Sequence, residues 1–174
     1  MKNYLVEYYD NTSQYYGSYH NHKEISAWAG LVLHMLFCQS IIQVGLPQNQ
    51  KIIGAASYSI VMFIAALFVF LYIQNQLLMK DRAGALAGAA KYILAEIIQK
   101  EEQDLDVSHY MAIEESSDVH AQSSHVLPHI LLSKSEVMNI RARGFQDKTK
   151  WMVYTLLWFS ACLTIGFKWL VALT

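Results

Sequence analysis

A histidine lies near the middle of the first long apolar stretch of this chain. His34 is followed one helical turn later by Cys38, and Gln39 comes next. A polar side chain is costly in hydrocarbon, so these groups should face other protein atoms or water. Two interpretations stay open: a pore or proton-linked site, and a hydrogen bond that fastens one helix to another. We expect the hydrogen bond.

The polar stretches contain histidines and carboxylates that could take part in chemistry. His120, His125 and His129 are spaced by five and then four residues, which is not a recognised ligand spacing, so no metal site is predicted. Glu101–Glu102 and Glu114–Glu115 are adjacent pairs, and adjacent residues of a helix point to different sides, so neither makes an acid/base pair. No cofactor motif is present, and we expect no enzymatic activity.

A charged cluster borders the first two apolar stretches. His22, Lys23 and Glu24 precede the first stretch, while Asp81 and Arg82 follow the second. If these stretches form a helical hairpin, the two groups come together at one end of it. The cluster then predicts an interfacial ion network, or alternatively a gate or switch.

Three long apolar stretches must position these residues: 25–44, 52–73 and 151–173. Each is close to the ~20 residues that a helix needs to cross the hydrocarbon core of a bilayer. Hydrophobic residues make up 54% of the chain and charged residues only 16%, against about 25% charged in ordinary soluble domains. The sequence therefore predicts an all-α integral membrane protein with three transmembrane helices.

The first two predicted spans are joined by a short connection, 45–51, that contains the turn residues Gly45 and Pro47. So short a connection predicts a helical hairpin of antiparallel neighbours. Ala55 and Ser59 lie four residues apart on one face of the second span. Small residues at this spacing allow close approach of another helix, although they are also common in membrane helices generally.

Helical periodicity continues beyond the second span. Apolar residues such as Leu86 and Ile93 recur at helical spacing and predict an amphipathic cytoplasmic helix that runs to about Asp104. This helix contains Gly84 and Gly88, each of which costs roughly 1 kcal/mol of helix propensity against alanine. Tight helix packing or a hinge would explain why two glycines are kept there.

The remaining polar chain predicts a flexible linker over 107–124, because acidic residues and serines occur there with little periodicity. A capping-box pattern at Ser133 predicts a short helix that ends near Gly144. Near the end of the third span, Lys168 is expected to extend its ammonium group to water.

Nine of the thirteen lysines and arginines lie between the second and third predicted spans. The positive-inside rule therefore places the region 74–150, and with it the amino-terminal segment 1–24, in the cytoplasm, and the carboxyl terminus outside. The expected location is a bacterial inner membrane. The segment 1–24 is rich in tyrosines, which suit a headgroup-level anchor or a recognition surface, or alternatively pack on the protein's own cytoplasmic helix or on lipid, as we expect: Tyr4, Tyr8, Tyr9, Tyr15, Tyr16 and Tyr19.

A formal net charge of -1 argues against nucleic acid as a partner. In outline, a two-span hairpin followed by a cytoplasmic helical segment resembles the SLATT-type proteins, small bacterial membrane effectors of nucleotide-signalled defence systems. The resemblance covers the architecture of roughly the first hundred residues, the third span departs from it, and no functional residue is carried over. We expect a self-associating membrane effector or regulator that acts on membrane integrity or permeability. The alternative is a non-catalytic accessory subunit of a larger membrane complex, with the lipid bilayer, further copies or another membrane protein as partners.

Overall fold

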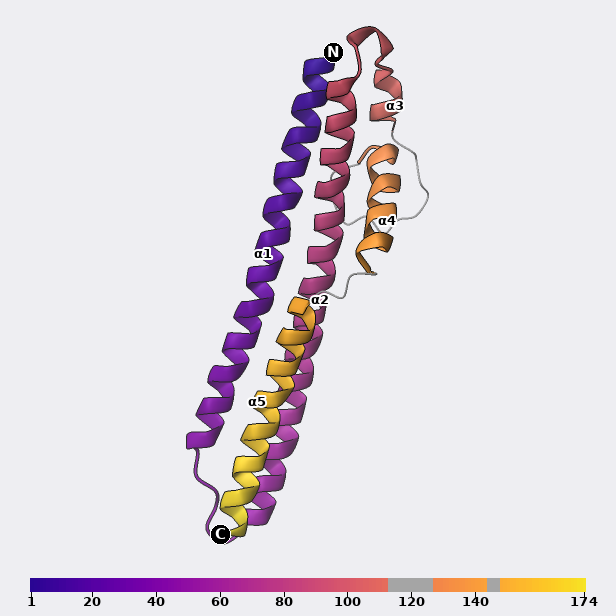
Figure 1. The fold of residues 1–174 in the computed structure, drawn as a ribbon. Helices are drawn as coiled ribbons and strands as arrows, with labels where there is room; N and C mark the ends of the chain where they lie inside the picture. Colours follow the sequence, from indigo (N-terminus) through magenta and orange to yellow (C-terminus); the bar gives the residue numbers. More distant parts are fainter. Residues whose placement is uncertain (113–126, 144–147) are drawn as a thin grey trace. The chain divides into compact units, whose positions relative to one another are not determined.

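The computed structural model describes residues 1–112, 127–143 and 148–174, and in these ranges the chain forms helices and short connections without any strand (Figure 1). The elements in chain order are α1 (Lys2–Gln43), α2 (Lys51–Gln99), a 3₁₀ turn η1 (Glu102–Asp104), α3 (Val107–Met111), α4 (His129–Arg143) and α5 (Lys148–Leu173). Three of them, α1, α2 and α5, are long and apolar enough to cross a membrane. The all-helical fold and the three apolar helices confirm the sequence prediction at this level.

The first helix is longer than the apolar stretch that predicted it. It begins at Lys2 and has 42 residues, so the tyrosine-rich segment is helical as well. Leu5, Tyr9 and Ser13 repeat every four residues and are all buried. Tertiary packing of this face explains a helix that hydropathy alone does not reveal.

The second helix ends at Gln99, and η1 then reaches Asp104, where the amphipathic helix was predicted to end. The short helix α3 occupies the beginning of the predicted linker. It starts after Asp106, whose carboxylate accepts hydrogen bonds from the backbone N–H groups of Ser108 and His109. Residues 113–124 of that linker, including Glu114 and Glu115, lie outside the described residues.

The helix α4 begins at His129, four residues before the predicted start at Ser133. Pro128 lies directly before this start, and its carbonyl oxygen accepts the first hydrogen bonds of the helix, from the backbone N–H groups of Leu131 at 3.0 Å and Leu132 at 3.2 Å. Ser133 lies in the second turn instead, and its hydroxyl donates to the Ile130 carbonyl oxygen at 3.1 Å. The prediction of a capping box at Ser133 is therefore wrong.

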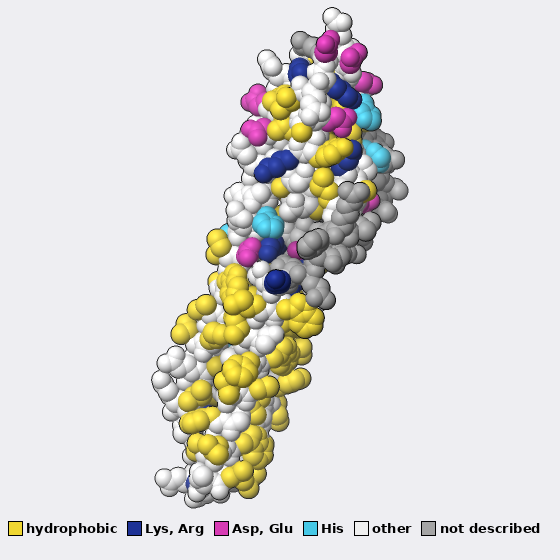
Figure 2. Space-filling model, viewed as in Figure 1, with side chains coloured by type: hydrophobic (Ala, Val, Ile, Leu, Met, Phe, Trp, Pro, Cys, Tyr) yellow, Lys and Arg dark blue, Asp and Glu magenta, His cyan; other side chains and the backbone are white. Residues whose placement is uncertain are grey.

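The chain divides into two compact units, each described by itself. The first, here called the polar unit, contains Met1–His22 and Met79–Gln146. The second, here called the apolar unit, contains Lys23–Leu78 and Asp147–Thr174. Figure 2 shows hydrophobic side chains covering the visible face of the apolar unit, whereas lysines, arginines, carboxylates and histidines are frequent on the polar unit.

The core of the polar unit lies between α1, α2, α3 and α4. Its fully buried members are Leu5, Tyr9, Ala89, Ala90, Ile93, Ile97, Tyr110 and Leu131. Alanines on the α2 side let the bulky side chains of α1 and α3 pack close to its backbone.

The core of the apolar unit lies between α1, α2 and α5. One buried cluster contains Ala27, Leu31, Ile73, Leu77, Val153 and Leu157. A second contains Cys38, Met62, Ala66 and Ala161, and its aromatic neighbour Trp158 stacks in a tilted arrangement against Phe63 and Phe70. Each cluster uses side chains from all three helices, which makes this unit a three-helix bundle.

Candidate functional site

The predicted intramembrane residues His34 and Cys38 lie together inside the apolar unit. Their side chains are only 2% and 4% exposed, and Cys38 Sγ lies 3.4 Å from His34 Nε2. The other ring nitrogen, Nδ1, makes no hydrogen bond to any described residue. The ring approaches the Leu157 backbone carbonyl of α5 without reaching normal hydrogen-bond geometry. The histidine therefore lies where α1 meets α5, with one nitrogen partnered on its own helix.

Gln39, the third member of that predicted group, is exposed and does not join the pair. Cys38 instead packs in one buried cluster with Met62 of α2 and Ala161 of α5. Met62 is fully buried and carries the second sulfur of this region. No sequence signal distinguishes it, because it is one apolar residue within a long apolar run.

A shallow groove of about 290 Å³ lies beside His34 on the surface of the apolar unit. Apart from the histidine, its lining is entirely apolar: Leu33, Phe37, Ala65, Phe68 and Val69. Such a lining suits an acyl chain or another apolar side chain better than water or ions.

Lys168 is buried, so the prediction that its ammonium group extends to water is wrong. The side chain is 2% exposed, and Nζ donates to the carbonyl oxygens of Ile42, at 3.2 Å, and of Val44. The same ammonium lies 5.1 Å from the ring centroid of Tyr58. The last carbonyls of a helix have no intrahelical donors, so the lysine of α5 supplies them at the end of α1.

A second polar contact lies one residue further along α5. The indole N–H of Trp169 donates to Ser59 Oγ at 3.0 Å, and that hydroxyl donates to the Ala55 carbonyl oxygen at 2.8 Å. Ala55 is fully buried. The predicted small-residue face of α2 thus packs within the chain, where Ser59 contacts α5.

The glycines Gly84 and Gly88 both lie at close approaches within the polar unit. A Cβ atom at Gly84 would lie 2.9 Å from Nδ1 of His20, which hydrogen-bonds the Lys80 carbonyl oxygen at 3.0 Å. A Cβ atom at Gly88 would lie 3.2 Å from Sδ of Met138 on α4. Both positions are occupied by neighbours from the same chain.

The predicted charged cluster is divided between the two units. His22, Asp81 and Arg82 belong to the polar unit, while Lys23 and Glu24 belong to the apolar unit. His22 and Arg82 are exposed, and the other three are half-buried. An ion network among all five stays a prediction.

The polar unit contains a hydrogen-bonded network that the sequence analysis missed. The Tyr110 hydroxyl donates to Glu96 Oε1 at 2.9 Å and accepts from Lys100 Nζ at 3.0 Å. Lys100 and Glu96 also form an ion pair at 3.3 Å. Burial by itself would raise the pKa of Glu96, but the hydrogen bond from Tyr110 and the nearby ammonium group outweigh it and lower the pKa. Spacing could have suggested only the ion pair, since Glu96 and Lys100 are four residues apart.

Two side chains of α1 donate hydrogen bonds to backbone carbonyl oxygens at or beside this network. The Tyr9 hydroxyl donates to the Tyr110 carbonyl oxygen at 2.6 Å, and burial raises the pKa of this tyrosine. Lys2 Nζ donates to the carbonyl oxygens of Ile98, at 3.1 Å, and Lys100, at 2.6 Å. These two carbonyls lie at the end of α2, so α1 caps α2 much as α5 caps α1 in the other unit.

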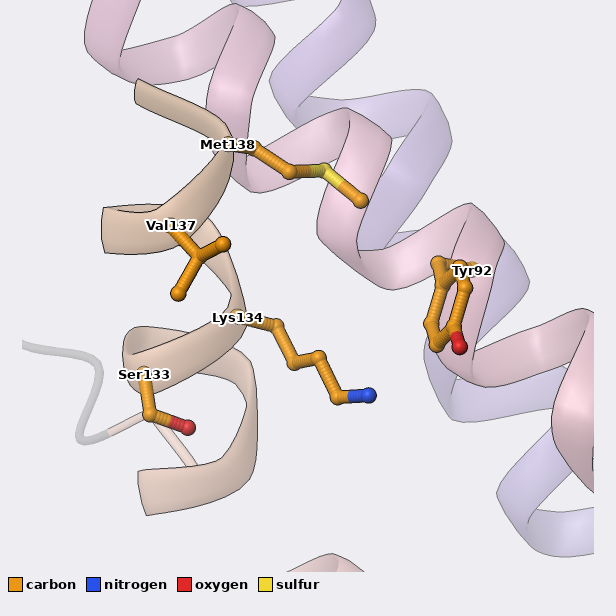
Figure 3. Close-up of a pocket in the computed structure, with 5 residues that line it drawn as sticks. All are labelled: Tyr92, Ser133, Lys134, Val137 and Met138. Carbon is orange, nitrogen blue, oxygen red and sulfur yellow. The ribbon is translucent and has the colours of Figure 1, made fainter. Parts of the chain in front are cut away.

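A groove of the polar unit lies between α2 and α4, with a volume of about 410 Å³. Figure 3 shows Lys134 reaching from α4 toward Tyr92 of α2, with Ser133, Val137 and Met138 completing the lining. The ammonium lies 4.3 Å from the centroid of the Tyr92 ring, a cation–π distance. The groove combines a positive charge, a hydroxyl and an apolar wall, which is a lining suited to an amphipathic partner.

The histidine series does not assemble into a site within the described chain. His129 is exposed at the start of α4, and His120 and His125 lie outside the described residues. Among the residues that the structure does describe, no group of three or more histidines, cysteines or carboxylates could hold a metal ion.

Comparison with known proteins gives no family, because no protein-family model, no curated protein and no solved structure matches the chain.

Proposed function

We propose that this chain is a multi-pass membrane protein that self-associates and acts on the integrity or permeability of the membrane that holds it. The observation that carries the proposal is that α1 and α2 each supply residues to both units. Two of the three helices that provide candidate spans therefore also build a polar unit with its own core. A partner bound to the polar unit would act on the same helices that form the apolar unit.

On this proposal, the path that makes the membrane permeable forms between copies of the chain and not through a single copy. In the apolar unit of one copy, the centre is filled by apolar side chains, and the ammonium group of Lys168 is bound to carbonyl oxygens of the same unit. The outer surface of this unit is largely uncovered, since only 17% of the most apolar 18-residue stretch of α2 is buried. Phe68 and Ile60 are 69% and 62% exposed. These faces are available to lipid and to further copies of the chain.

The groove between α2 and α4 is the proposed binding surface of the polar unit. Ser133, Tyr92 and Val137 of its lining are exposed, the last two at 52% each, and Lys134 and Met138 are half-buried. A trigger that binds there contacts α2 directly, which is why this groove suits a sensing role better than a surface of α4 alone.

The proposed location is a bacterial inner membrane, with the polar unit in the cytoplasm and the connection between α1 and α2 outside. Support comes from the nine of thirteen lysines and arginines that lie between residues 80 and 150. Labelling of single cysteines tests it, in a chain whose own two cysteines are replaced by serine. Asn49→Cys should react with an impermeant reagent on intact cells, and Glu101→Cys only after the inner face is opened. The opposite pattern would reverse the orientation.

Expression in bacteria tests the action on the membrane. We expect growth arrest and entry of an impermeant dye, compared with a multi-pass protein of similar size expressed to the same level. Absence of both effects, together with co-purification of larger unrelated chains, would instead favour the accessory-subunit function. The exposed apolar faces of the spans support that second function, since they could pack on a larger complex.

A further inference from the structure

The buried interior of the apolar unit contains an imidazole, a thiol and a thioether: the side chains of His34, Cys38 and Met62. His34 Nε2 lies 3.4 Å from Cys38 Sγ, and Met62 packs in the same buried cluster as the cysteine. All three side chains are at least 96% buried, since their exposed fractions are 2%, 4% and 0%. Imidazole, thiolate and thioether are the ligands that soft metal ions such as copper(I) prefer.

The separation of the two closest donors suits a shared ion. A metal bonded to nitrogen at about 2.0 Å and to sulfur at about 2.3 Å holds those atoms roughly 3.5 Å apart at a tetrahedral angle. The observed 3.4 Å requires almost no rearrangement of α1, because residues four apart on a helix already face the same side. The other ring nitrogen of His34, Nδ1, makes no hydrogen bond to any described residue.

Charge decides which kind of ion this environment accepts. When a monovalent ion binds, the Cys38 thiol loses its proton and the sulfur bonds to the metal, so one positive charge enters and one leaves. The site then stays neutral, with no change in oxidation state of the metal or the sulfur. A divalent ion would leave a net positive charge in apolar surroundings, which is costly.

We propose that His34, Cys38 and Met62 form a binding site for copper(I) in the centre of the three-helix bundle. His34 also lines a groove of about 290 Å³ on the surface of the apolar unit. The site goes beyond the proposed action on the membrane and does not depend on self-association.

Copper(I) retention by the purified full chain in detergent tests the proposal. The protein is mixed with one equivalent of copper(I) under reducing, oxygen-free conditions, then challenged with a competing copper(I) chelator. We expect about one copper per chain, with the ultraviolet absorption of a copper–thiolate bond. The matched control is Cys162→Ser, because Cys162 is exposed on α5 and is the other cysteine of the chain. This variant should retain copper as the parent does.

Two variants separate binding from folding. Cys38→Ser removes the thiolate, and its affinity should fall by more than the roughly 10–100-fold that follows loss of an outer-shell partner. Met62→Leu keeps the side-chain volume and the fold but removes the thioether, so it should lower retention while leaving the melting temperature of the metal-free protein unchanged. The proposal is overturned if the parent loses its copper to the chelator, if Cys38→Ser retains it, or if Cys162→Ser releases it.

Discussion

The two units of this chain use polar contacts in different ways. In the polar unit, side chains from α1, α2 and α3 form one connected network around Tyr110, which bonds to Glu96, Lys100 and Tyr9. In the apolar unit the polar contacts are separate, and the principal one is the ammonium group of Lys168 at the end of α1. Glu96 and Lys100 of this network are partly exposed, so water can replace part of the energy lost when one of them loses a partner, whereas an isolated contact in apolar surroundings has no such replacement.

The largest effect should come from the isolated lysine. Lys168→Met keeps most of the side-chain volume but leaves the Ile42 and Val44 carbonyl oxygens without their donor, so we expect a loss of about 1–3 kcal/mol in unfolding free energy. Thermal unfolding in detergent measures it. Lys148→Met, at an exposed position at the start of α5, is the control and should change little. If the two variants are equally stable, the hydrogen bonds of Lys168 do not stabilise the fold.

Removing a member of the network should cost less. Tyr110→Phe loses the hydroxyl that joins Glu96 to Lys100 but keeps the buried ring, so we expect a loss of about 1 kcal/mol, localised at α3. Amide hydrogen exchange over Val107–Met111 should then accelerate while exchange in α5 stays unchanged. Tyr15→Phe, at an exposed position of α1, serves as the control. Uniform acceleration in both units would contradict the division into two regions.

Acidification should weaken the same network. The folded-state pKa of Glu96 lies below its ordinary value of 4.5, so its contribution is complete above that pH and is lost as the pH falls through the lower, folded value. Exchange at α3 should therefore accelerate at low pH in the parent. In Glu96→Gln this residue's contribution to the pH dependence should be absent. An identical pH response in the two proteins would show that another group controls α3.

The smallest effects concern the two glycines, and they should have opposite signs. Gly84→Ala gains roughly 1 kcal/mol of helix propensity but pushes the His20 ring from its bond to the Lys80 carbonyl, so we expect net destabilisation. Gly88→Ala meets only the flexible end of Met138 and should be slightly stabilising. Chemical unfolding of both variants measures the difference. Stabilisation by both alanines would show that the His20 contact is unimportant.

Hydropathy was sufficient to predict the three apolar helices, because a span must be long and uninterrupted whatever it packs against. It could not predict the helix over residues 2–24, which depends on burial of Leu5 and Tyr9 against other elements. The burial of Lys168 was equally hidden, since its carbonyl partner Ile42 lies 126 residues away in the chain. Local spacing did place His34 beside Cys38, because residues four apart always share a helix face.

Native mass spectrometry of the full chain in mild detergent tests the central claim, that this is a self-associating membrane protein. We predict a homo-oligomer of defined size that persists when the protein is diluted in buffer whose detergent stays above its critical micelle concentration. A monomer, or a complex in which one copy accompanies larger unrelated chains, would contradict it.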